Sequence, residues 1–431
     1  MSKKSPQNNT KGIMFILDGL GDRPLPALQG QTPLEAAATP NLDQLAAHGL
    51  CGLSDPLSPG LPVGTHTGTA VLLGLPPHAA ARLSRGPVEA AGVGIPLAPG
   101  DVTLRANFAT LSKQKGRFTI LDRRAGRIQQ GVAELAALLQ EVELGDGITA
   151  SLHPATHYRA VLHLHGPALS AGITDTDPGD HEIHLGVQSS VPSESDRGAL
   201  VTAQAVNQFL RIAHKRLRQD PINLQREAAG LPPANGIITR GAGRLETITS
   251  MIAHYRLRAA LISGESTVIG LGRLLGFTVM SDPRFTALPN TDLSAKLAAA
   301  RQALEQHHLV FVHIKAPDIL SHDRQPEQKR DFLERFDQAL GELLPSPLVL
   351  CVTGDHSTDS LAGVHSGDPV PSLLYAPHGR RDRCQQFGET PCLSGGLGRL
   401  SASALLCSML DAMGCLPQYR NSDAELFGLG G

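Results

Sequence analysis

The feature that most constrains this chain is an apolar run that ends in two ligand-type residues, Leu348-Val-Leu-Cys-Val-Thr-Gly-Asp-His-Ser-Thr358. The part from Leu348 to Val352 predicts a buried strand, which Gly354 ends. Adjacent residues on a regular strand point to opposite faces, but past the glycine this alternation lapses, so Asp355 and His356 can turn toward one site. A carboxylate beside an imidazole makes half of a divalent-metal site, although the pair could equally be solvated in a turn. Further carboxylates at strand ends would favour the metal site.

Two other apolar runs end in this way. Gly12–Leu17 predicts a central strand that presents Asp18, followed by glycines that let a ligand approach. Leu309–Ile314 predicts a strand that leads to Asp318 and, four residues later, His322. One helical turn can aim residues at this spacing at a single ion. Each carboxylate alone could simply belong to a turn, but three at strand ends favour a shared site.

Thr65 and His365 complete the set of candidate ligands. Thr65 follows a Pro/Gly-rich loop and precedes an apolar stretch, so we expect it at or just before a helix N-terminus. There the backbone N–H groups favour an anion, although Thr65 could also be only an N-cap. Three carboxylates and three imidazoles could hold two divalent ions, and the Thr65 hydroxyl could bind one of them and ionise.

Counting charges adds a requirement for arginine. Two dications are balanced by three carboxylates and one alkoxide, so a phosphate dianion needs additional positive charge. Arg123, Arg124 and Arg127 lie within five residues and could form an anion clamp, although such a cluster is usually a solvated turn. Further candidates for the same role are Arg85, Arg159 and Arg240.

Composition excludes several classes of protein. The chain has 431 residues, which predicts two domains or one domain with an insertion. The net charge is -2 and no Lys/Arg block stands out, which argues against nucleic-acid or polybasic membrane binding. The six cysteines lack CxxC spacing and fit a reduced, cytoplasmic location. We expect no signal peptide in the polar tail, residues 1–11, and no membrane span.

Eight short motifs occur along nearly the whole chain in a specific order. They are Leu17-Asp-Gly-Leu-Gly-Asp22, Thr32-Pro-Leu-Glu-Ala36, Arg85-Gly-Pro-Val-Glu-Ala90, Asp122-Arg-Arg-Ala-Gly-Arg127, Thr174-Asp-Thr-Asp-Pro178, Arg240-Gly-Ala-Gly243, Thr353-Gly-Asp-His-Ser-Thr358 and His365-Ser-Gly-Asp-Pro-Val-Pro371. Together they resemble the cofactor-independent (2,3-bisphosphoglycerate-independent) phosphoglycerate mutases of archaeal type, in the alkaline phosphatase superfamily.

This resemblance implies a fold and a metal site. The fold is α/β, with a doubly wound, mostly parallel sheet of alkaline-phosphatase-like type and an inserted, smaller α+β cap domain. Residues 12–80 and 236–431 would form the metal-binding domain, and residues 81–235 the cap. Two divalent metals are implied, manganese in the first place, with zinc, cobalt or magnesium as alternatives. The resemblance assigns one to Asp18, Thr65, Asp355 and His356, and the other to Asp318, His322 and His365.

The implied activity is interconversion of 3-phosphoglycerate and 2-phosphoglycerate in glycolysis and gluconeogenesis, through a phosphorylated Thr65. The family loop reads like Gly-Ser-Asp-Thr-Ala-His, whereas here it is Gly64-Thr-His-Thr-Gly-Thr69, so threonine replaces the serine nucleophile. Alternatives are a related metal-dependent phosphatase, a phosphonate-pathway phosphotransferase, or an inactive binding protein. The expected partner is a small phosphorylated substrate, with neither nucleic acid nor membrane involved.

Overall fold

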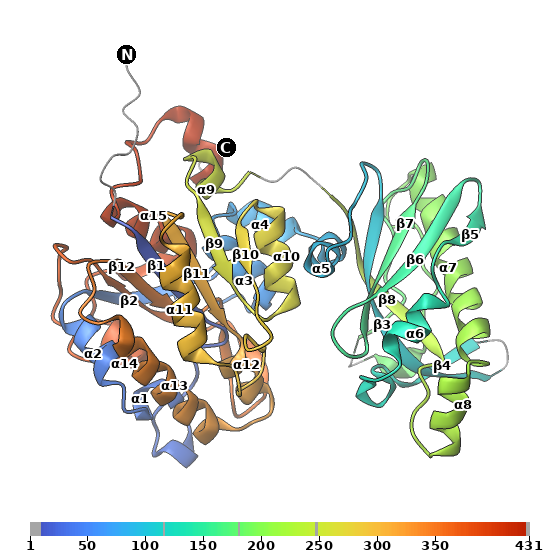
Figure 1. Ribbon diagram of the computed structural model, residues 1–431, viewed down its shortest axis with the longest axis horizontal. Coiled ribbons are helices and arrows are strands. Elements are labelled where there is room, and N and C mark those ends of the chain that lie inside the picture. Colours follow the sequence, from blue (N-terminus) through green and yellow to red (C-terminus); the bar gives the residue numbers. More distant parts are fainter. Residues whose placement is uncertain (1–9, 115–116, 180–181, 246–248, 428–431) are drawn as a thin grey trace. The chain divides into compact units, whose positions relative to one another are not determined.

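The computed structural model describes residues 10–114, 117–179, 182–245 and 249–427 (Figure 1). The first nine residues of the expected polar tail lie outside this range. The chain divides into two compact units: a core unit, Met1–Leu83 with Ile248–Gly431, and a cap unit, Ser84–Thr247. The prediction that the core unit resumes at residue 236 is wrong, because strand β8 (Gly236–Arg244) pairs with β3 (Val102–Gln114) of the cap unit.

The core unit contains a mixed sheet of eight strands. Its order is β10 (Thr278–Met280), β9 (Ala259–Ile262), β11 (Leu309–Ile314), β1 (Gly12–Leu17), β12 (Val349–Thr353), β15 (Val370–Tyr375), β2 (Leu50–Asp55) and β16 (Gly398–Ser401). All neighbours from β10 to β12 are parallel, whereas β15 is antiparallel to both β12 and β2. A separate hairpin pairs β13 (Ser357–Asp359) with β14 (Val364–Ser366). The expected mostly parallel α/β sheet is confirmed.

Helices cover both faces of this sheet (Figure 1). Ile13, Phe15 and Leu17 belong to one buried cluster, whereas the other side of β1 approaches Met409 and Met413. A strand buried on both faces explains the continuous apolar runs of the sequence. The core unit's helices are η1 (Pro26–Leu28), α1 (Pro33–Ala36), α2 (Pro40–Ala47), α3 (Thr65–Leu72), α4 (Pro77–Arg82), α9 (Met251–His254), α10 (Ser266–Leu274), α11 (Leu293–Ala303), α12 (Ala316–His322), α13 (Pro326–Leu340), η4 (Gly341–Leu343), α14 (Glu389–Cys392), α15 (Ala402–Ala412) and η5 (Asn421–Phe427).

The cap unit is an antiparallel sheet with helices. The strands run in the order β4 (Arg117–Asp122), β3, β7 (Arg159–His165), β6 (Ile148–Pro154) and β5 (Val142–Gly145), and β8 pairs with β3. Its helices are α5 (Arg85–Val93), η2 (Ala125–Arg127), α6 (Val132–Ala137), η3 (Ile183–Leu185), α7 (Arg197–Leu217) and α8 (Pro221–Ala228). Leu104 and Leu162 pack with Phe209 of α7 in the cap's own core.

The topology of the core unit places the site. Strand β1 lies between β11 and β12 and is parallel to both, so the three strands end at one edge of the sheet. The loops that follow them carry the three carboxylates predicted as ligands. Within the described residues, every helix is too short or too polar to cross a lipid bilayer.

Candidate active site

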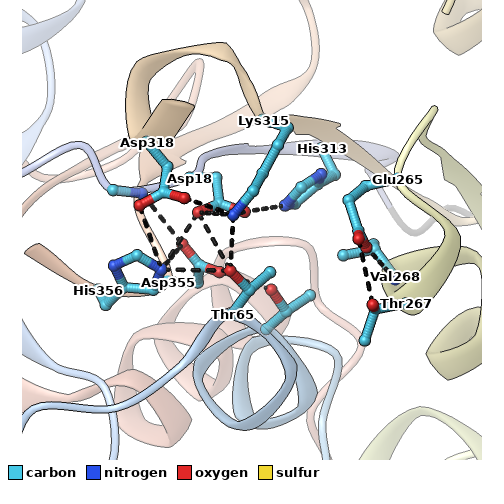
Figure 2. Close-up of polar contacts among 12 residues, drawn as sticks. Asp18, Thr65, Glu265, Thr267, Val268, His313, Lys315, Asp318, Asp355 and His356 are labelled. Atoms are coloured by element: carbon cyan, nitrogen blue, oxygen red, sulfur yellow. Dashed lines mark hydrogen bonds and ion pairs between the residues drawn. The ribbon is translucent and has the colours of Figure 1, made fainter. Parts of the chain in front are cut away.

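The three carboxylates meet at this edge, together with a hydroxyl from α3 (Figure 2). Asp18 directly follows β1, Asp318 lies in the first turn of α12, and Asp355 follows the strand-ending glycine after β12. Asp18 and Asp355 are fully buried, and Asp318 is nearly so. Gly19, at φ 65°, lets the first loop approach Asp318 closely, because a Cβ there would lie 2.9 Å from the Asp318 Cα. Buried carboxylates at this density require cations around them.

A first cluster surrounds Thr65. The hydroxyl oxygen lies 3.4 Å from Asp18 Oδ1 and 3.3 Å from His356 Nε2, which itself lies 3.1 Å from Asp18 Oδ1. His356 Nδ1–H donates to the Thr358 hydroxyl at 3.1 Å, and that hydroxyl donates to Asp318 at 2.8 Å. In the neutral ring the proton is therefore on Nδ1, and the Nε2 lone pair faces the site. A histidine that binds a metal through Nε2 needs this tautomer.

A second cluster consists of Asp318, His322 and His365. His322 Nδ1–H donates to the Gly363 carbonyl at 2.8 Å, and His365 Nδ1–H donates to the Val63 carbonyl at 2.7 Å. The two Nε2 lone pairs therefore face each other at 3.0 Å, and each Nε2 lies 3.4 Å from Asp318 Oδ1. Two opposed lone pairs beside a carboxylate repel each other unless a cation lies between them. The residues present thus fit a divalent metal.

Lys315 lies among these carboxylates, and no local sequence pattern singles it out. Its Nζ donates to Thr65 Oγ1 at 2.8 Å, to Asp18 Oδ1 at 3.0 Å and to Asp318 Oδ2 at 2.6 Å. Burial would raise the pKa of Asp18, but the Lys315 ammonium and hydrogen bonds from His313 and His356 hold that pKa well below its usual range. Burial also opposes protonation of His356, yet the carboxylates of Asp355 and Asp18 raise its pKa to about 9. A metal ion that binds Nε2 would displace this proton. The carboxylates of the site attract cations.

His313, also absent from the predicted set, holds Asp18 from the other side. Its Nε2 lies 3.0 Å from Asp18 Oδ2, and the side chain is fully buried. His313 is the fifth residue of β11, inside an apolar run, which is why sequence analysis treated it as part of the strand.

Thr65 is the first residue of α3, and Gly64 is the N-cap. The alternative that Thr65 is only an N-cap is therefore wrong. Thr69, which replaces the family histidine of the loop, donates to Asp355 Oδ2 at 2.8 Å. Gly68 lets α3 approach Asp355, because a Cβ at this position would lie 1.9 Å from the Asp355 carbonyl oxygen. The altered loop is thus tied to the strand end that carries Asp355.

The predicted arginines fall into two groups in the cap unit. Arg123 forms a buried bidentate ion pair with Asp177, at 2.8 Å from Nε to Oδ1 and 2.5 Å from Nη2 to Oδ2. Its charge is therefore already balanced within the cap. Arg124 and Arg127 lie in the following turn, and Arg127 is exposed.

Arg85, Arg159 and Arg240 instead gather around Arg105, which sequence analysis missed. Arg105 Nη1 lies 3.6 Å from Glu89 Oε1, and Arg105 is paired with Arg240 in the β3–β8 register. Burial, together with repulsion from the other three arginines, lowers the pKa of Arg105 to about 9. The Nε groups of Arg105 and Arg240 are buried without a hydrogen-bond partner in the described structure. This arginine cluster can accept an anion.

Comparisons with known proteins agree with this geometry. The family model described as 2,3-bisphosphoglycerate-independent phosphoglycerate mutase matches residues 46–223. A protein of that name from Methanopyrus kandleri is 40% identical over 408 residues, 93% of this chain and 96% of the relative. A solved Pyrococcus horikoshii protein superposes with a TM-score of 0.81 at 32% identity, covering 96% of this chain and 99% of its own. The cofactor-independent phosphoglycerate mutase from Thermoplasma acidophilum superposes with a TM-score of 0.68 at 32% identity, covering 94% of this chain and 100% of its own.

A mostly parallel α/β sheet with two adjoining clusters suited to metal ions, and a hydroxyl beside them, is the architecture of a metal-dependent phosphoryl-transfer enzyme. Identity near 40% over almost the full length narrows the class to one family. The chain belongs to the 2,3-bisphosphoglycerate-independent phosphoglycerate mutases.

Proposed function

We propose that the chain interconverts 3-phosphoglycerate and 2-phosphoglycerate through a phosphothreonine at position 65. The observation that carries this proposal is the environment of the Thr65 hydroxyl. It lies at the N-terminus of α3, accepts a hydrogen bond from Lys315, and faces Asp18 and His356. A donor that favours the ionised oxygen, with acceptors for its proton, is the arrangement that activates a nucleophile.

The metal-dependence of the family extends this proposal to two divalent ions. Asp18, Thr65, Asp355 and His356 would hold one of them, and Asp318, His322 and His365 the other; manganese is our first choice for both. When bound, such ions supply Lewis-acid stabilisation of phosphoryl oxygens. The mixed carboxylate and imidazole ligands suit manganese, zinc or cobalt, so the choice of manganese rests on the family resemblance.

The protein's own groups account for the remaining steps. The Thr65 hydroxyl, which donates to Asp18, gives up its proton in that direction, and its oxygen attacks phosphorus. The phosphorus–oxygen bond to the glycerate breaks, and the departing oxygen takes up a proton. In the reverse transfer, the other glycerate hydroxyl attacks the phosphothreonine and restores Thr65. The glycerate must stay bound between the two transfers, and we assign its anionic groups to Arg85, Arg105, Arg159 and Arg240.

A related phosphatase or phosphonate-pathway phosphotransferase is the second candidate. The altered nucleophile loop favours it: His66 replaces the family aspartate, and its Nε2 lies 3.2 Å from the Thr67 hydroxyl. In a phosphatase, the additional imidazole of His66 beside Thr65 would activate a water molecule, and the enzyme would not need to retain the glycerate. Either reaction would take place in the cytoplasm, as the scattered cysteines predict.

Acid-quenched mass spectrometry combined with product analysis tests the proposal. Wild-type enzyme with 3-phosphoglycerate should carry one phosphoryl group on Thr65 and release 2-phosphoglycerate. Thr65→Ala should lose both turnover and the phosphoryl group on residue 65, whereas Thr65→Ser should retain both. The matched control is Thr67→Ala, two residues later in the same helix. Release of inorganic phosphate in place of 2-phosphoglycerate would identify a phosphatase, and full activity of Thr65→Ala would exclude the covalent route.

A further inference from the structure

Three thiols from distant parts of the sequence meet in the core unit. Cys51 lies on β2, Cys392 ends α14, and Cys384 lies in the segment before α14. One sulfur each from Cys51 and Cys384 and one carboxylate oxygen of Asp382 lie within 4.8 Å of one another. The thiol of Cys392 is close enough to that of Cys51 for the two to interact. All three residues are buried, with at most 7% exposure, and are thiols rather than disulfides.

Asp382 orients this cluster. Its Oδ2 accepts from the backbone N–H of Cys51 at 2.7 Å and of Gly396 at 2.6 Å, and its Oδ1 accepts from that of Cys384 at 2.8 Å. One carboxylate therefore joins β2 to the 22-residue segment 376–397, in which the structure assigns only the four-residue helix α14. Because this segment forms so few backbone hydrogen bonds of regular secondary structure, an added cross-link would stabilise it more than it would a helix or strand.

The proposal rests on this arrangement of the side chains. Thiols bind a metal as thiolates, so binding of a cation to the cluster would release their protons.

We propose that Cys51, Cys384 and Cys392, with Asp382, form a structural site for a thiophilic cation of the zinc class. Soft sulfur ligands select such ions, whereas the Asp/His clusters offer no sulfur. Ligand atoms around a tetrahedral zinc ion lie about 3.3–3.8 Å apart, as follows from metal–ligand distances near 2.0–2.3 Å. Shifts of about 1 Å would bring the ligand atoms of Cys51, Cys384 and Asp382 into this range. A cavity of about 570 Å³, lined by Asp43, Arg383, Cys384 and Pro391 among others, gives the ion access.

Cobalt substitution tests the proposal on the full chain, because only a site with sulfur ligands gives sulfur-to-cobalt charge-transfer absorption. Wild-type protein loaded with Co²⁺ should show this absorption, and His322→Ala, which impairs the Asp/His site, should keep it. Cys384→Ser should lose it. The matched control is Cys407→Ser in α15, whose thiol lies 3.7 Å from the Met251 sulfur.

A second measurement follows the thiols directly. In mild denaturant, where buried thiols become open to a thiol reagent, bound zinc should protect three thiols of the wild-type chain, and a chelator should restore their reactivity. Zinc should also raise the Tm of His322→Ala by on the order of 5 °C more than that of the double variant His322→Ala with Cys384→Ser. Absence of charge-transfer absorption in cobalt-loaded wild type, or a Cys51–Cys392 disulfide in freshly purified protein, would overturn the metal site.

Discussion

The Nζ of Lys315 lies 2.8 Å from the hydroxyl oxygen of Thr65, and the same ammonium bonds two carboxylates of the site. Lys315 is only 16% exposed, so its charge acts in a medium that screens weakly. It balances part of the negative charge of Asp18, Asp318 and Asp355, which metal ions would otherwise have to neutralise. Lys315 and the metals therefore share the same carboxylates.

Replacing Lys315 by Met should separate its two effects. Removal of the ammonium leaves the carboxylates with less compensation, so calorimetric titration should show tighter binding of Mn²⁺. The hydrogen bond to Thr65 is lost at the same time, and we expect kcat to fall by about 10²–10³, as for removal of one preorganised donor. Lys315→Arg keeps the charge and is the control. Unchanged kcat in Lys315→Met would remove this residue from the reaction.

The second cluster predicts a specific metal stoichiometry. His322→Ala removes one of the two opposed imidazoles, so elemental analysis should show a loss of about one ion per chain. The first cluster does not use His322 and should keep its ion. His78, an exposed residue of α4, is the matched histidine for a control substitution. Equal metal content in His322→Ala and wild type would argue against a two-site arrangement.

Two arginines of the cap should behave differently. Arg240→Leu removes a member of the arginine cluster, and we expect KM to rise on the order of 10–100-fold while the cap stays folded. Arg123→Leu leaves Asp177 buried and uncompensated, which typically costs about 3–5 kcal/mol of stability. Steady-state kinetics and denaturant unfolding measure the two effects. Should Arg123→Leu raise KM without loss of stability, its ion pair with Asp177 would not be its main role.

Glu389 predicts a pH-dependent stability. Burial raises its pKa to about 7, although hydrogen bonding to Thr32 acts in the opposite direction. A carboxyl whose pKa is higher in the folded state stabilises fully below the unfolded value of about 4.3, and this stabilisation is lost as pH rises toward 7. The expected change is on the order of 2–4 kcal/mol.

Glu389→Gln should flatten that profile, because glutamine does not titrate. Its Oε1 can still accept from the Asp22 N–H, and its Nε2–H can donate to the Thr32 hydroxyl oxygen in place of the bond that this hydroxyl donates to Glu389. Tm measured between pH 4.5 and 7 checks it, with the exposed Glu305→Gln as control. A parallel decline in wild type and Glu389→Gln would assign the pH dependence to other groups.

The sequence predicted the carboxylates and imidazoles because they follow apolar strands, and strand ends are local signals. Asp18, Asp318 and Asp355 could be predicted because each follows an apolar run. The three runs form neighbouring strands of the sheet. The roles of these residues as ligands still await the metal measurements. Lys315 and Arg105 carry no local signal, since a lysine in a loop or an arginine in a strand usually faces solvent.

Local sequence patterns do not report contacts between distant residues, as Arg123 and strand β8 show. Arg123 was singled out for its neighbours in sequence, but its partner Asp177 is 54 residues away. The family resemblance implied that the core unit resumes at residue 236, which is where β8 begins. Only its antiparallel register with β3 shows the correct unit. Pairings at such distances along the chain depend on tertiary structure, which periodicity does not report.

The two ends of the cap unit lie next to each other. Val102, the first residue of β3, pairs with Arg244, the last residue of β8, and a side chain at Gly243 would collide with Ser84, the first residue of the cap. The polypeptide thus enters the cap at Ser84, just before α5, and leaves it after β8, close to the same point. The cap can accordingly be treated as a removable module: a gene fragment for residues 84–245 should express a domain that folds alone, and a short linker should close the gap that it leaves.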